Sequence, residues 1–381
     1  MGQGIASNRN ALKEGVCAIS KLEHFPSRYA DLQLFGEVKI SNDQLREQLN
    51  AYEVSTTRTS LLAQLAFEEA VQDSGLEENL ISSYDTALIG ASTVGGMCQT
   101  DELYQDANYL STRSPYLTSY DSASVMMYIQ SRYGIKGVVN TINTACSSSA
   151  NSISYGARLI QHGFAKRAIV GGTDSLAKFT INGFNALMIL SASLCKPFDR
   201  DRNGLNLAEG AAFLVLEREE DCNGKKVYAE LSGYANTNDA FHPSSLSDNG
   251  DGPFASMQEA LSLANLKPSD IDYINAHGTG TENNDIVEST AMRNLFGENI
   301  PFSSTKANIG HTLGASGAIE AVYCIFNLVH QELYPNLRFE NPIPETNLVP
   351  VLQYQQKKLK HIMSNSFGFG GNCSSLIFSK V

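Results

Sequence analysis

The sequence lacks the cysteine pattern of a disulfide or dithiol protein. Its seven cysteines are scattered, their number is odd, and no two of them form a Cys-x-x-Cys pair. Such a distribution suits a reducing compartment, where free cysteines serve mostly as small buried apolar residues. We therefore expect a cytoplasmic protein without a disulfide framework.

Basic residues are also scarce relative to acidic ones. Lysine and arginine number 28 against 40 aspartates and glutamates, which gives a formal net charge of −12. This balance argues against nucleic acid as the default partner. An acidic protein partner would have to dock on a local basic patch that the total charge conceals.

Long apolar runs and targeting signals are not found. No apolar run reaches the roughly 18 residues of a membrane-spanning helix, and residues 1–6 contain no basic stretch followed by an apolar block. We expect neither a membrane span nor a signal peptide. The 381 residues, 42% of them hydrophobic, suit two domains or one large duplicated unit.

What the sequence does contain is an alternation of strand-like and helical segments, which predicts an α/β architecture. Residues 86–92, 167–173 and 211–217 are apolar runs typical of buried strands, and residues 58–76 have helical periodicity. The polar turn at 221–225 is the predicted boundary between two halves, residues 1–222 and 223–381.

The two halves resemble each other around two reactive residues. A strand-like run at 138–142 leads into a segment of small residues that begins at Cys146, and a run at 300–304 leads into one that begins at His311. Small side chains allow backbones to approach closely, so both segments are predicted to be helices in a crowded centre. The similarity indicates an internal duplication.

Cys146 is the candidate nucleophile. A helix N-terminus offers unpaired N–H groups and the positive end of a dipole, and both favour the reactive thiolate. The alternative is an inert buried cysteine, which is the commoner situation for a free cysteine. His277 lies in a Gly/Thr-rich loop, and His311 follows Lys306 by five residues. A zinc site of one cysteine and two histidines is the other reading, but the spacings match no common ligand pattern, so no metal is expected.

Four segments together resemble the β-ketoacyl-acyl-carrier-protein synthases of the elongating type. They are residues 143–149 (Asn-Thr-Ala-Cys-Ser-Ser-Ser), 276–281 with Asp285, 304–317 (Ser-Thr-Lys through Gly-His-Thr-Leu-Gly-Ala-Ser-Gly) and 365–371 (Asn-Ser-Phe-Gly-Phe-Gly-Gly). The resemblance covers nearly the whole chain in the right order. It implies a thiolase-like fold, in which two duplicated halves form a five-layered α-β-α-β-α core.

The resemblance also implies a role for each motif residue. Cys146 would carry the acyl group, and His277 and His311 would stabilise the enolate formed when a malonyl group loses CO₂. Lys306 and Glu320 would support the histidines as a buried ion pair.

Three further residues would serve the substrate. The backbone N–H groups of Cys146 and Phe369 would hold the oxyanion, and Phe369 would act as a mobile gate. Thr279 and Thr281 would bind the pantetheine arm of the carrier.

The implied partners are acyl carrier proteins in their acyl and malonyl forms, with substrates on 4′-phosphopantetheine and no tightly bound cofactor. The product would be a 3-oxoacyl-carrier protein of fatty-acid, polyketide or polyene synthesis. The subunits would form a homodimer or a heterodimer with a subunit that resembles a chain-length factor. Four arginines are candidates for docking the acidic carrier: Arg58, Arg113, Arg200 and Arg202.

The chain departs from the family pattern in three places. It opens at a glycine turn where the family has a preceding hydrophobic strand, so we expect the first half to contain one strand fewer than the second. Residues 202–205 read Arg-Asn-Gly-Leu, and residues 370–373 read Gly-Gly-Asn-Cys. Because the last two changes surround the gate, the acyl range stays open.

Three related classes are alternatives. A thiolase would replace one histidine with a second catalytic cysteine, and an initiating synthase would use a Cys-His-Asn set. A chain-length factor would share the fold but typically lacks the nucleophile. The presence of Cys146, His277 and His311 together favours an active elongating enzyme.

Overall fold

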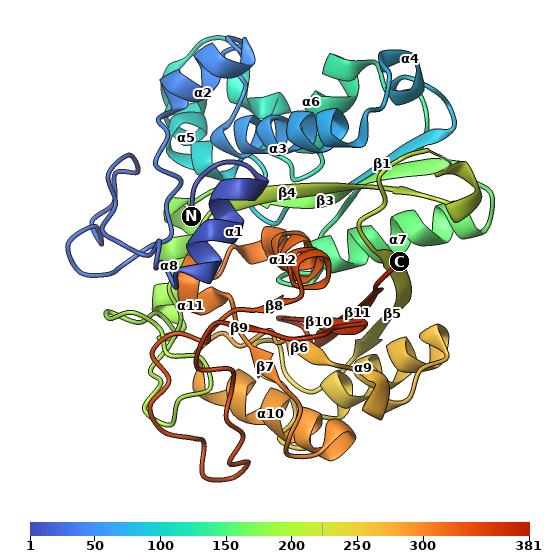
Figure 1. Ribbon diagram of the computed structural model, residues 1–381. Helices are drawn as coiled ribbons and strands as arrows, with labels where there is room; N and C mark the ends of the chain where they lie inside the picture. Colours follow the sequence, from blue (N-terminus) through green and yellow to red (C-terminus); the bar gives the residue numbers. More distant parts are fainter. Residues whose placement is uncertain (223) are drawn as a thin grey trace.

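The computed structural model describes residues 1–222 and 224–381, and in it five layers alternate between helices and sheets (Figure 1). The predicted boundary at residue 223 lies outside the described residues. The α-β-α-β-α order agrees with the expected core.

The first sheet belongs to the N-terminal half. Its strands, in order across the sheet, are β2 (Val139–Ile142), β1 (Thr86–Ala91), β3 (Arg167–Asp174) and β4 (Gly210–Glu217). The first three run parallel, and β4 is antiparallel to β3. Helices α3 (Arg58–Ser74) and α6 (Ser124–Tyr133) cover its outer face. The three predicted strands and the helix that ends at Gly75 are confirmed.

The second sheet belongs to the C-terminal half. Its strands, in order, are β5 (Glu230–Asn238), β11 (Asn372–Ser379), β10 (His361–Gly368), β6 (Tyr273–Asn275) and β7 (Phe302–Ser303). Strand β10 runs parallel to β6 and antiparallel to β11, and β11 is antiparallel to β5. Helices α9 (Asp251–Ala264) and α10 (Glu282–Phe296) form the outer layer on this side.

Two helices of small residues fill the middle layer, α7 (Ser148–Gln161) and α12 (Ser316–His330). A Cβ on Gly317 of α12 would lie 2.7 Å from the backbone N of Ala150 in α7. A Cβ on Gly156 of α7 would lie 2.3 Å from Val170 Cγ1 of β3. The expected crowding is therefore present, and it depends on glycine where the helices meet their neighbours.

The two sheets share one topology. Strands β2, β1, β3 and β4 match β7, β6, β10 and β11 in order and in sense, and α7 and α12 occupy the same place in the chain between them. Strand β5 has no counterpart beside β4 among the described residues. This confirms the internal duplication and the expectation that the first half has one strand fewer.

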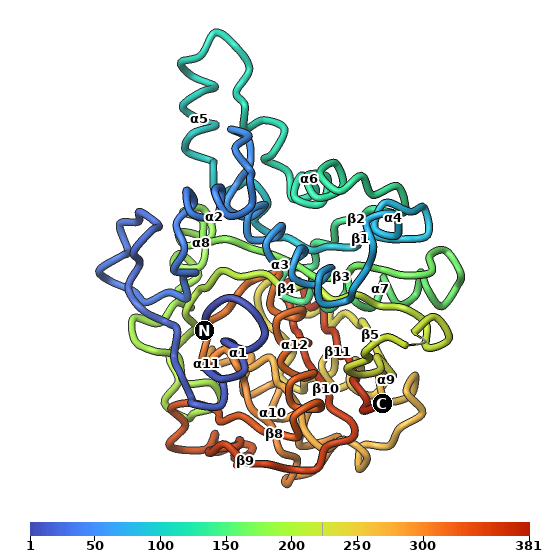
Figure 2. Tube along the Cα trace, turned by 45° about the horizontal axis from the view of Figure 1, so that its top comes forward, coloured from blue at the N-terminus to red at the C-terminus, as the bar shows by residue number. Residues whose placement is uncertain are grey.

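The remaining helices and short strands surround this core. Helix α1 (Ile5–Lys13) packs against α12, α2 (Asn42–Leu49) packs against α3, and α5 (Thr100–Tyr109) stands away from the body in Figure 2. The shorter helices and strands are α4 (Glu78–Ile81), α8 (Lys178–Ala186), α11 (Lys306–Ile309), β8 (Glu332–Leu333), β9 (Gln355–Gln356) and five 3-10 turns, η1 (Met97–Gln99), η2 (Pro115–Thr118), η3 (Glu219–Asp221), η4 (Pro268–Asp270) and η5 (Leu313–Ala315).

One stretch corrects the expectation about apolar runs. Residues 313–330 are long and apolar enough, by length and composition, to cross a membrane. However, 78% of this stretch is buried inside the protein, because it contains α12, the central helix. Its apolar character is explained by packing between two sheets.

Arg58 is placed by the fold in a way that excludes one predicted role. Its guanidinium lies at the start of α3, 7% exposed, and binds Glu209 at 2.5 Å together with the carbonyl groups of Val38 and Ile40. A buried, fully engaged arginine joins α3 to the segment before β4. The prediction that Arg58 docks a carrier protein is wrong.

The close approach of α7 to β3 gives a test of the packing argument. Gly156→Ala should lower the free energy of unfolding by about 1–3 kcal/mol, because the added methyl group overlaps Val170. Gly183→Ala is the matched control, since this exposed glycine of α8 has nothing within 4 Å of the added Cβ. That change should be neutral or stabilising by up to about 1 kcal/mol. Urea unfolding measures both, and equal effects would contradict the packing argument.

Candidate active site

Cys146 sits in a strained turn between β2 and α7. Helix α7 begins at Ser148, so the cysteine precedes the helix by two residues and does not open it, contrary to the prediction. Ala145 has a φ of 53°, in the left-handed region, and Thr144 and Cys146 form an isolated bridge. The turn presents the thiol toward the second half of the protein, where it is 6% exposed.

The end of β10 reaches this turn from the other half. A Cβ on Gly368 would lie 2.7 Å from the carbonyl oxygen of Thr144 and 3.1 Å from the backbone N of Cys146. Only glycine permits that approach. It brings the next residue, Phe369, against the thiol, and its backbone N–H acts with that of Cys146 to favour the thiolate.

Burial of the Cys146 sulfur opposes the effect of these two N–H groups on the thiol pKa, and it is the larger of the two effects. It raises the pKa of the Cys146 thiol to about 11, although Lys306 and the two backbone N–H groups act in the opposite direction. The backbone N–H groups act in the expected direction, toward the thiolate, but burial of the sulfur outweighs them, so the resting group is the thiol.

The structure brings both predicted histidines to Cys146. The sulfur and one ring nitrogen of each of His277 and His311 all lie within 4.8 Å of one another. The two rings are 5.4 Å apart at 89°, and the side chains are almost wholly buried. Burial and the nearby ammonium of Lys306 lower the pKa of both imidazoles well below the usual value, so both are neutral.

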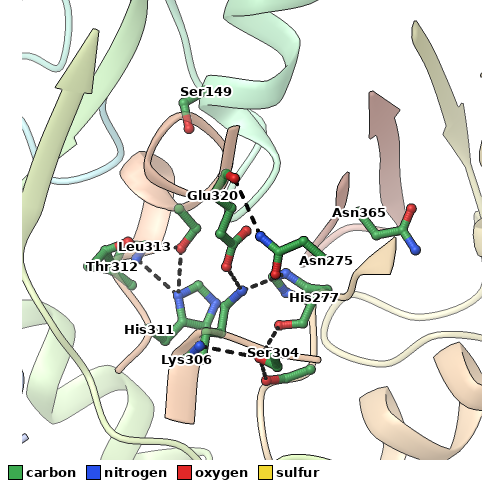
Figure 3. Close-up of polar contacts among 12 residues, drawn as sticks. Ser149, Asn275, His277, Ser304, Lys306, His311, Thr312, Leu313, Glu320 and Asn365 are labelled. Atoms are coloured by element: carbon green, nitrogen blue, oxygen red, sulfur yellow. Dashed lines mark hydrogen bonds and ion pairs between the residues drawn. The ribbon is translucent and has the colours of Figure 1, made fainter. Parts of the chain in front are cut away.

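Hydrogen bonds select the same tautomer in the two rings (Figure 3). The backbone N–H of Leu313 donates to Nδ1 of His311 at 3.0 Å, and Nζ of Lys306 donates to Nδ1 of His277 at 3.2 Å. Each Nδ1 is thus an acceptor, so the proton of each neutral ring resides on Nε2. The site therefore holds two uncharged N–H donors.

Lys306 and Glu320 form a buried ion pair behind the histidines. Nζ of Lys306 lies 2.5 Å from Oε1 of Glu320, and both side chains are 1% exposed. The lysine comes from α11 and the glutamate from α12, as predicted for supporting residues (Figure 3). Because an ammonium cannot accept a hydrogen bond, its contact with His277 fixes the direction of that bond.

Two buried carboxylates that the sequence analysis missed hold the histidine loops. Glu288 of α10 accepts the N–H groups of His277 and Gly278, each at 2.8 Å, and burial raises its pKa to about 7. Asp174, the last residue of β3, accepts the N–H of Gly314 at 2.7 Å, next to the residue that contacts His311. An acidic residue at the end of an apolar strand was a signal that could have identified Asp174.

Thr279 and Thr281 lie beside the histidine loop as predicted. Their hydroxyl groups are 2.8 Å apart, and Thr281 is the residue directly before α10, without a side-chain capping hydrogen bond. Arg202 donates to the carbonyl oxygen of Thr281 at 3.0 Å and to that of Glu282. Arg202 is thus a half-buried support for this loop, and its docking of a carrier protein stays a prediction.

The other two docking candidates are exposed. Arg200 lies on the surface and pairs with Asp201 at 3.1 Å. Arg113 is exposed between α5 and η2, on the projection seen in Figure 2. Both remain accessible to a partner.

Phe369, which is predicted to act as a gate, stacks on a ring that the sequence analysis did not single out. Phe369 lies against Phe184 of α8, with centroids 5.7 Å apart and planes at 22°. Residue 372, one of the departures from the family, ties the same loop to the nucleophile turn. Its side-chain oxygen accepts hydrogen bonds from Ser147 and Asn236 at 2.7 Å and from Asn151 at 2.9 Å.

Among the described residues, one group of side chains has metal-ligating atoms close together, Cys146, His277 and His311. These atoms would have to move closer to bind zinc, whose ligands lie only about 2.0–2.3 Å from the ion. The side-chain oxygens of Asn275, Glu320 (Oε2) and Ser364 are buried without a hydrogen-bond partner among the described residues. Ser364 and Asn275 face each other across β10 and β6.

Two family models together match nearly nine-tenths of the chain. "Beta-ketoacyl synthase, N-terminal domain" matches residues 1–222, and "Beta-ketoacyl synthase, C-terminal domain" matches residues 228–340. The chain is 33% identical over 389 residues to 3-oxoacyl-[acyl-carrier-protein] synthase 2 of Staphylococcus aureus (strain COL), with 97% of this chain and 93% of the relative covered.

Solved structures that superpose on this chain are also ketosynthases. The ishigamide ketosynthase/chain length factor superposes with a TM-score of 0.92 at 26% identity, covering 100% of this chain and 96% of that one. A type II polyketide ketosynthase in complex with its acyl-carrier protein gives 0.88 at 28% identity, with 100% and 96% covered. The ketosynthase of Xenorhabdus doucetiae in complex with its chain length factor gives 0.82 at 31% identity, with 99% and 94% covered.

The aromatic stack predicts how access to the thiol is controlled. Phe184→Ala should speed alkylation of Cys146 by iodoacetamide about 2- to 12-fold, because an aromatic pair contributes about 0.5–1.5 kcal/mol to the closed position of Phe369. Phe179→Ala, on the same helix but 60% exposed, is the matched control and should leave the rate unchanged. Mass spectrometry of Cys146 against time measures both rates. An unchanged rate for Phe184→Ala would show that the stack does not hold the gate.

Proposed function

The chain belongs to the β-ketoacyl synthase family and is an elongating condensing enzyme of that family, and we propose that Cys146, His277 and His311 carry its reaction. The observation that supports this assignment most strongly is the pair of neutral imidazoles. Both are fixed as Nε2–H donors, and both face one buried thiol. In the proposal, residues 1–222 supply the nucleophile and residues 223–381 supply the donors.

The first half-reaction loads the acyl group. The sulfur of Cys146 attacks the carbonyl carbon of an acyl thioester on phosphopantetheine, a new C–S bond forms, and the carrier thiol leaves with the proton that the cysteine gives up. The backbone N–H groups of Cys146 and Phe369 hold the oxyanion of the tetrahedral intermediate. Because the resting group is a thiol with a raised pKa, the proton moves only as the attack proceeds.

The second half-reaction forms the new carbon–carbon bond. A malonyl thioester loses CO₂, and the electron pair of the broken C–C bond becomes an enolate. The Nε2–H groups of His277 and His311 donate to the enolate oxygen, where the negative charge develops. The enolate carbon then attacks the acyl carbonyl on Cys146, the sulfur leaves, and the product is a 3-oxoacyl thioester on the carrier.

The remaining residues of the proposed site position the reacting groups and the substrate for these two half-reactions. Lys306, neutralised by Glu320, keeps the proton of His277 on Nε2, and its charge disfavours an imidazolium. Thr279 and Thr281 offer hydroxyl groups to the pantetheine arm beside this loop. Phe369 opens and closes access to Cys146.

Acyl carrier protein is the proposed partner, in its acyl and malonyl forms, and phosphopantetheine is its prosthetic arm. A related ketosynthase was solved in complex with such a carrier, and others with a chain length factor. A second subunit, identical or similar, is supported by exposed apolar side chains near the free edge of β2 and on α5, among them Val138, Tyr104 and Tyr109. A cytoplasmic location is supported by seven free cysteines.

Separate assays of the two half-reactions test the roles of the three residues. Cys146→Ala should abolish acyl loading and condensation, while Cys222→Ala should retain both. His277→Ala and His311→Ala should slow malonyl decarboxylation roughly 10²–10³-fold, as expected for a lost oxyanion donor, and slow acyl loading less. Acyl adducts are read by mass spectrometry, and CO₂ release by labelled malonyl carrier. Unimpaired decarboxylation in both histidine variants would refute the assignment.

Charge reversal at the surface tests how the carrier docks. Arg200→Glu should raise the apparent KM for a carrier-bound substrate several-fold, more so at low salt, because rim charges act mainly on association. Turnover of a small pantetheine thioester should stay unchanged. Lys166→Glu is the control, since this exposed lysine pairs with Asp85 at the end of β3 remote from the site. Equal losses with both substrates would mean that Arg200 serves the fold.

A further inference from the structure

Two cysteines outside the catalytic centre meet on the backbone of α11, the helix that carries Lys306. Sγ of Cys195 donates to the carbonyl oxygen of Lys306 at 3.5 Å, and Sγ of Cys17 donates to that of Ala307 at 3.8 Å. Because these two carbonyl groups belong to consecutive residues of α11, both sulfurs lie against the same small patch of backbone. Neither cysteine takes part in the reaction assigned to Cys146.

Both cysteines are held in place by backbone contacts. Cys17 lies in the segment after α1, and its neighbours on both sides hydrogen-bond to Asn308 of α11, at 2.7 and 3.0 Å. The backbone N–H of Cys195 donates to the side-chain oxygen of Asn206 at 2.8 Å. The two sulfurs therefore meet through the packing of two fixed segments against one helix.

Arg338 is the third side chain of this cluster. Its guanidinium donates to the carbonyl oxygen of Cys195 at 2.9 Å and also to that of Ala307, which Cys17 contacts. Burial raises the pKa of the Cys195 thiol to about 11, while Arg338 acts in the opposite direction and the nearby Cys17 acts with burial. A guanidinium at this place stabilises negative charge that develops on the Cys195 sulfur during a reaction.

The two thiols differ in their access to solvent. Cys195 is 1% exposed, whereas Cys17 is half-buried. A small oxidant such as hydrogen peroxide therefore reaches Cys17 first, and the buried Cys195 reacts with the product. An accessible thiol beside a second, resolving thiol is the arrangement of a redox-sensing pair.

We propose that Cys17 and Cys195 form a reversible disulfide in the presence of a peroxide, and that this bridge slows condensation by restraining α11. The Cys17 sulfur attacks one oxygen of hydrogen peroxide, the O–O bond breaks, and one water leaves as the sulfenic acid forms. The Cys195 sulfur then attacks the Cys17 sulfur, the S–O bond breaks, and the hydroxide leaves with the thiol proton as a second water. Two thiols are oxidised to one disulfide, the peroxide is reduced to two waters, and a dithiol reductant reverses the change.

The structure tolerates the loss of the two thiol hydrogen bonds. The carbonyl oxygen of Lys306 also accepts the N–H of Gly310 at 2.9 Å, and that of Ala307 also accepts a hydrogen bond from Arg338. Both carbonyl groups therefore keep a partner when the bridge forms. Because the sulfurs of a disulfide are only about 2.05 Å apart, the two segments must close on each other beside the backbone of α11.

The effect on the active site passes through Lys306. Its ammonium donates to His277 and pairs with Glu320, so a displaced α11 backbone changes where the Nε2–H donor of His277 lies. This consequence rests on the function proposed for His277, whereas formation of the bridge does not.

The bridge is tested by peptide mapping in the Cys146→Ala protein, in which peroxide cannot oxidise the nucleophile. After treatment with hydrogen peroxide, mass spectrometry without reduction should find a disulfide between Cys17 and Cys195 of one chain, and dithiothreitol should remove it. Absence of this disulfide, or Cys17 paired only with other cysteines, would overturn the proposal. The mapping decides this point even if the reaction assigned to His277 fails, so the two failures are distinguishable.

The regulation is tested by CO₂ release from malonyl-acyl-carrier protein, with Cys146 intact. Peroxide should slow the release at least about threefold, because small displacements of catalytic groups have large effects on rate, and dithiothreitol should restore it. Cys17→Ser and Cys195→Ser should each abolish this restorable inhibition, while Cys222→Ser, which changes a cysteine outside the cluster, should retain it. Equal inhibition in all three variants, or a bridge without any change in rate, would overturn the regulatory role.

Discussion

The backbone contact between the two central helices is the constraint on which the rest of the structure depends. Gly317 of α12 packs against the backbone of Ala150 in α7 more closely than any side chain would allow. Because α7 follows the nucleophile turn and α12 follows the histidine turn, this contact brings the two halves of the site together. Where Gly368 meets the carbonyl of Thr144, the same kind of approach delivers the gate loop. Large residues at these points would separate the thiol from its N–H donors.

Burial is the second physical consequence of that contact, and it sets the charges of the site. Water is excluded from Cys146 and from both histidines, so each is most stable in its uncharged form. One close ion pair lies behind these groups, Lys306 with Glu320, and the second carboxylate oxygen of Glu320 is buried without a hydrogen-bond partner among the described residues. A site of neutral donors around a neutral thiol stabilises negative charge only when the reaction creates it. That is the condition for favouring a transition state over a ground state.

The sequence predicted the elements and the grouping of Cys146, His277 and His311, because strand periodicity, small-residue runs and four motifs are all local signals. It predicted Lys306 and Glu320 as supporting residues, but not Glu288, Asp174 and Phe184. These three contact the site across 10, 140 and 185 residues of sequence, and only Asp174, an acidic residue at the end of an apolar strand, carries a local signal of its role. The misassigned Arg58 shows the same limit. It is a conspicuous charge in the sequence, but its ion pair with Glu209 lies in the protein interior.

The position of Asn372 links the chain's departure from its family to the chemistry. One amide oxygen accepts hydrogen bonds from Ser147, next to the nucleophile, and from Asn236 on the neighbouring strand. The gate residue, three positions earlier, stacks on α8 and shares its loop with that oxygen. In the proposed gating role, movement of Phe369 away from α8 would act on the segment whose Asn372 holds the turn of Cys146. We therefore expect gate opening and nucleophile position to be linked through this one side chain, in both directions.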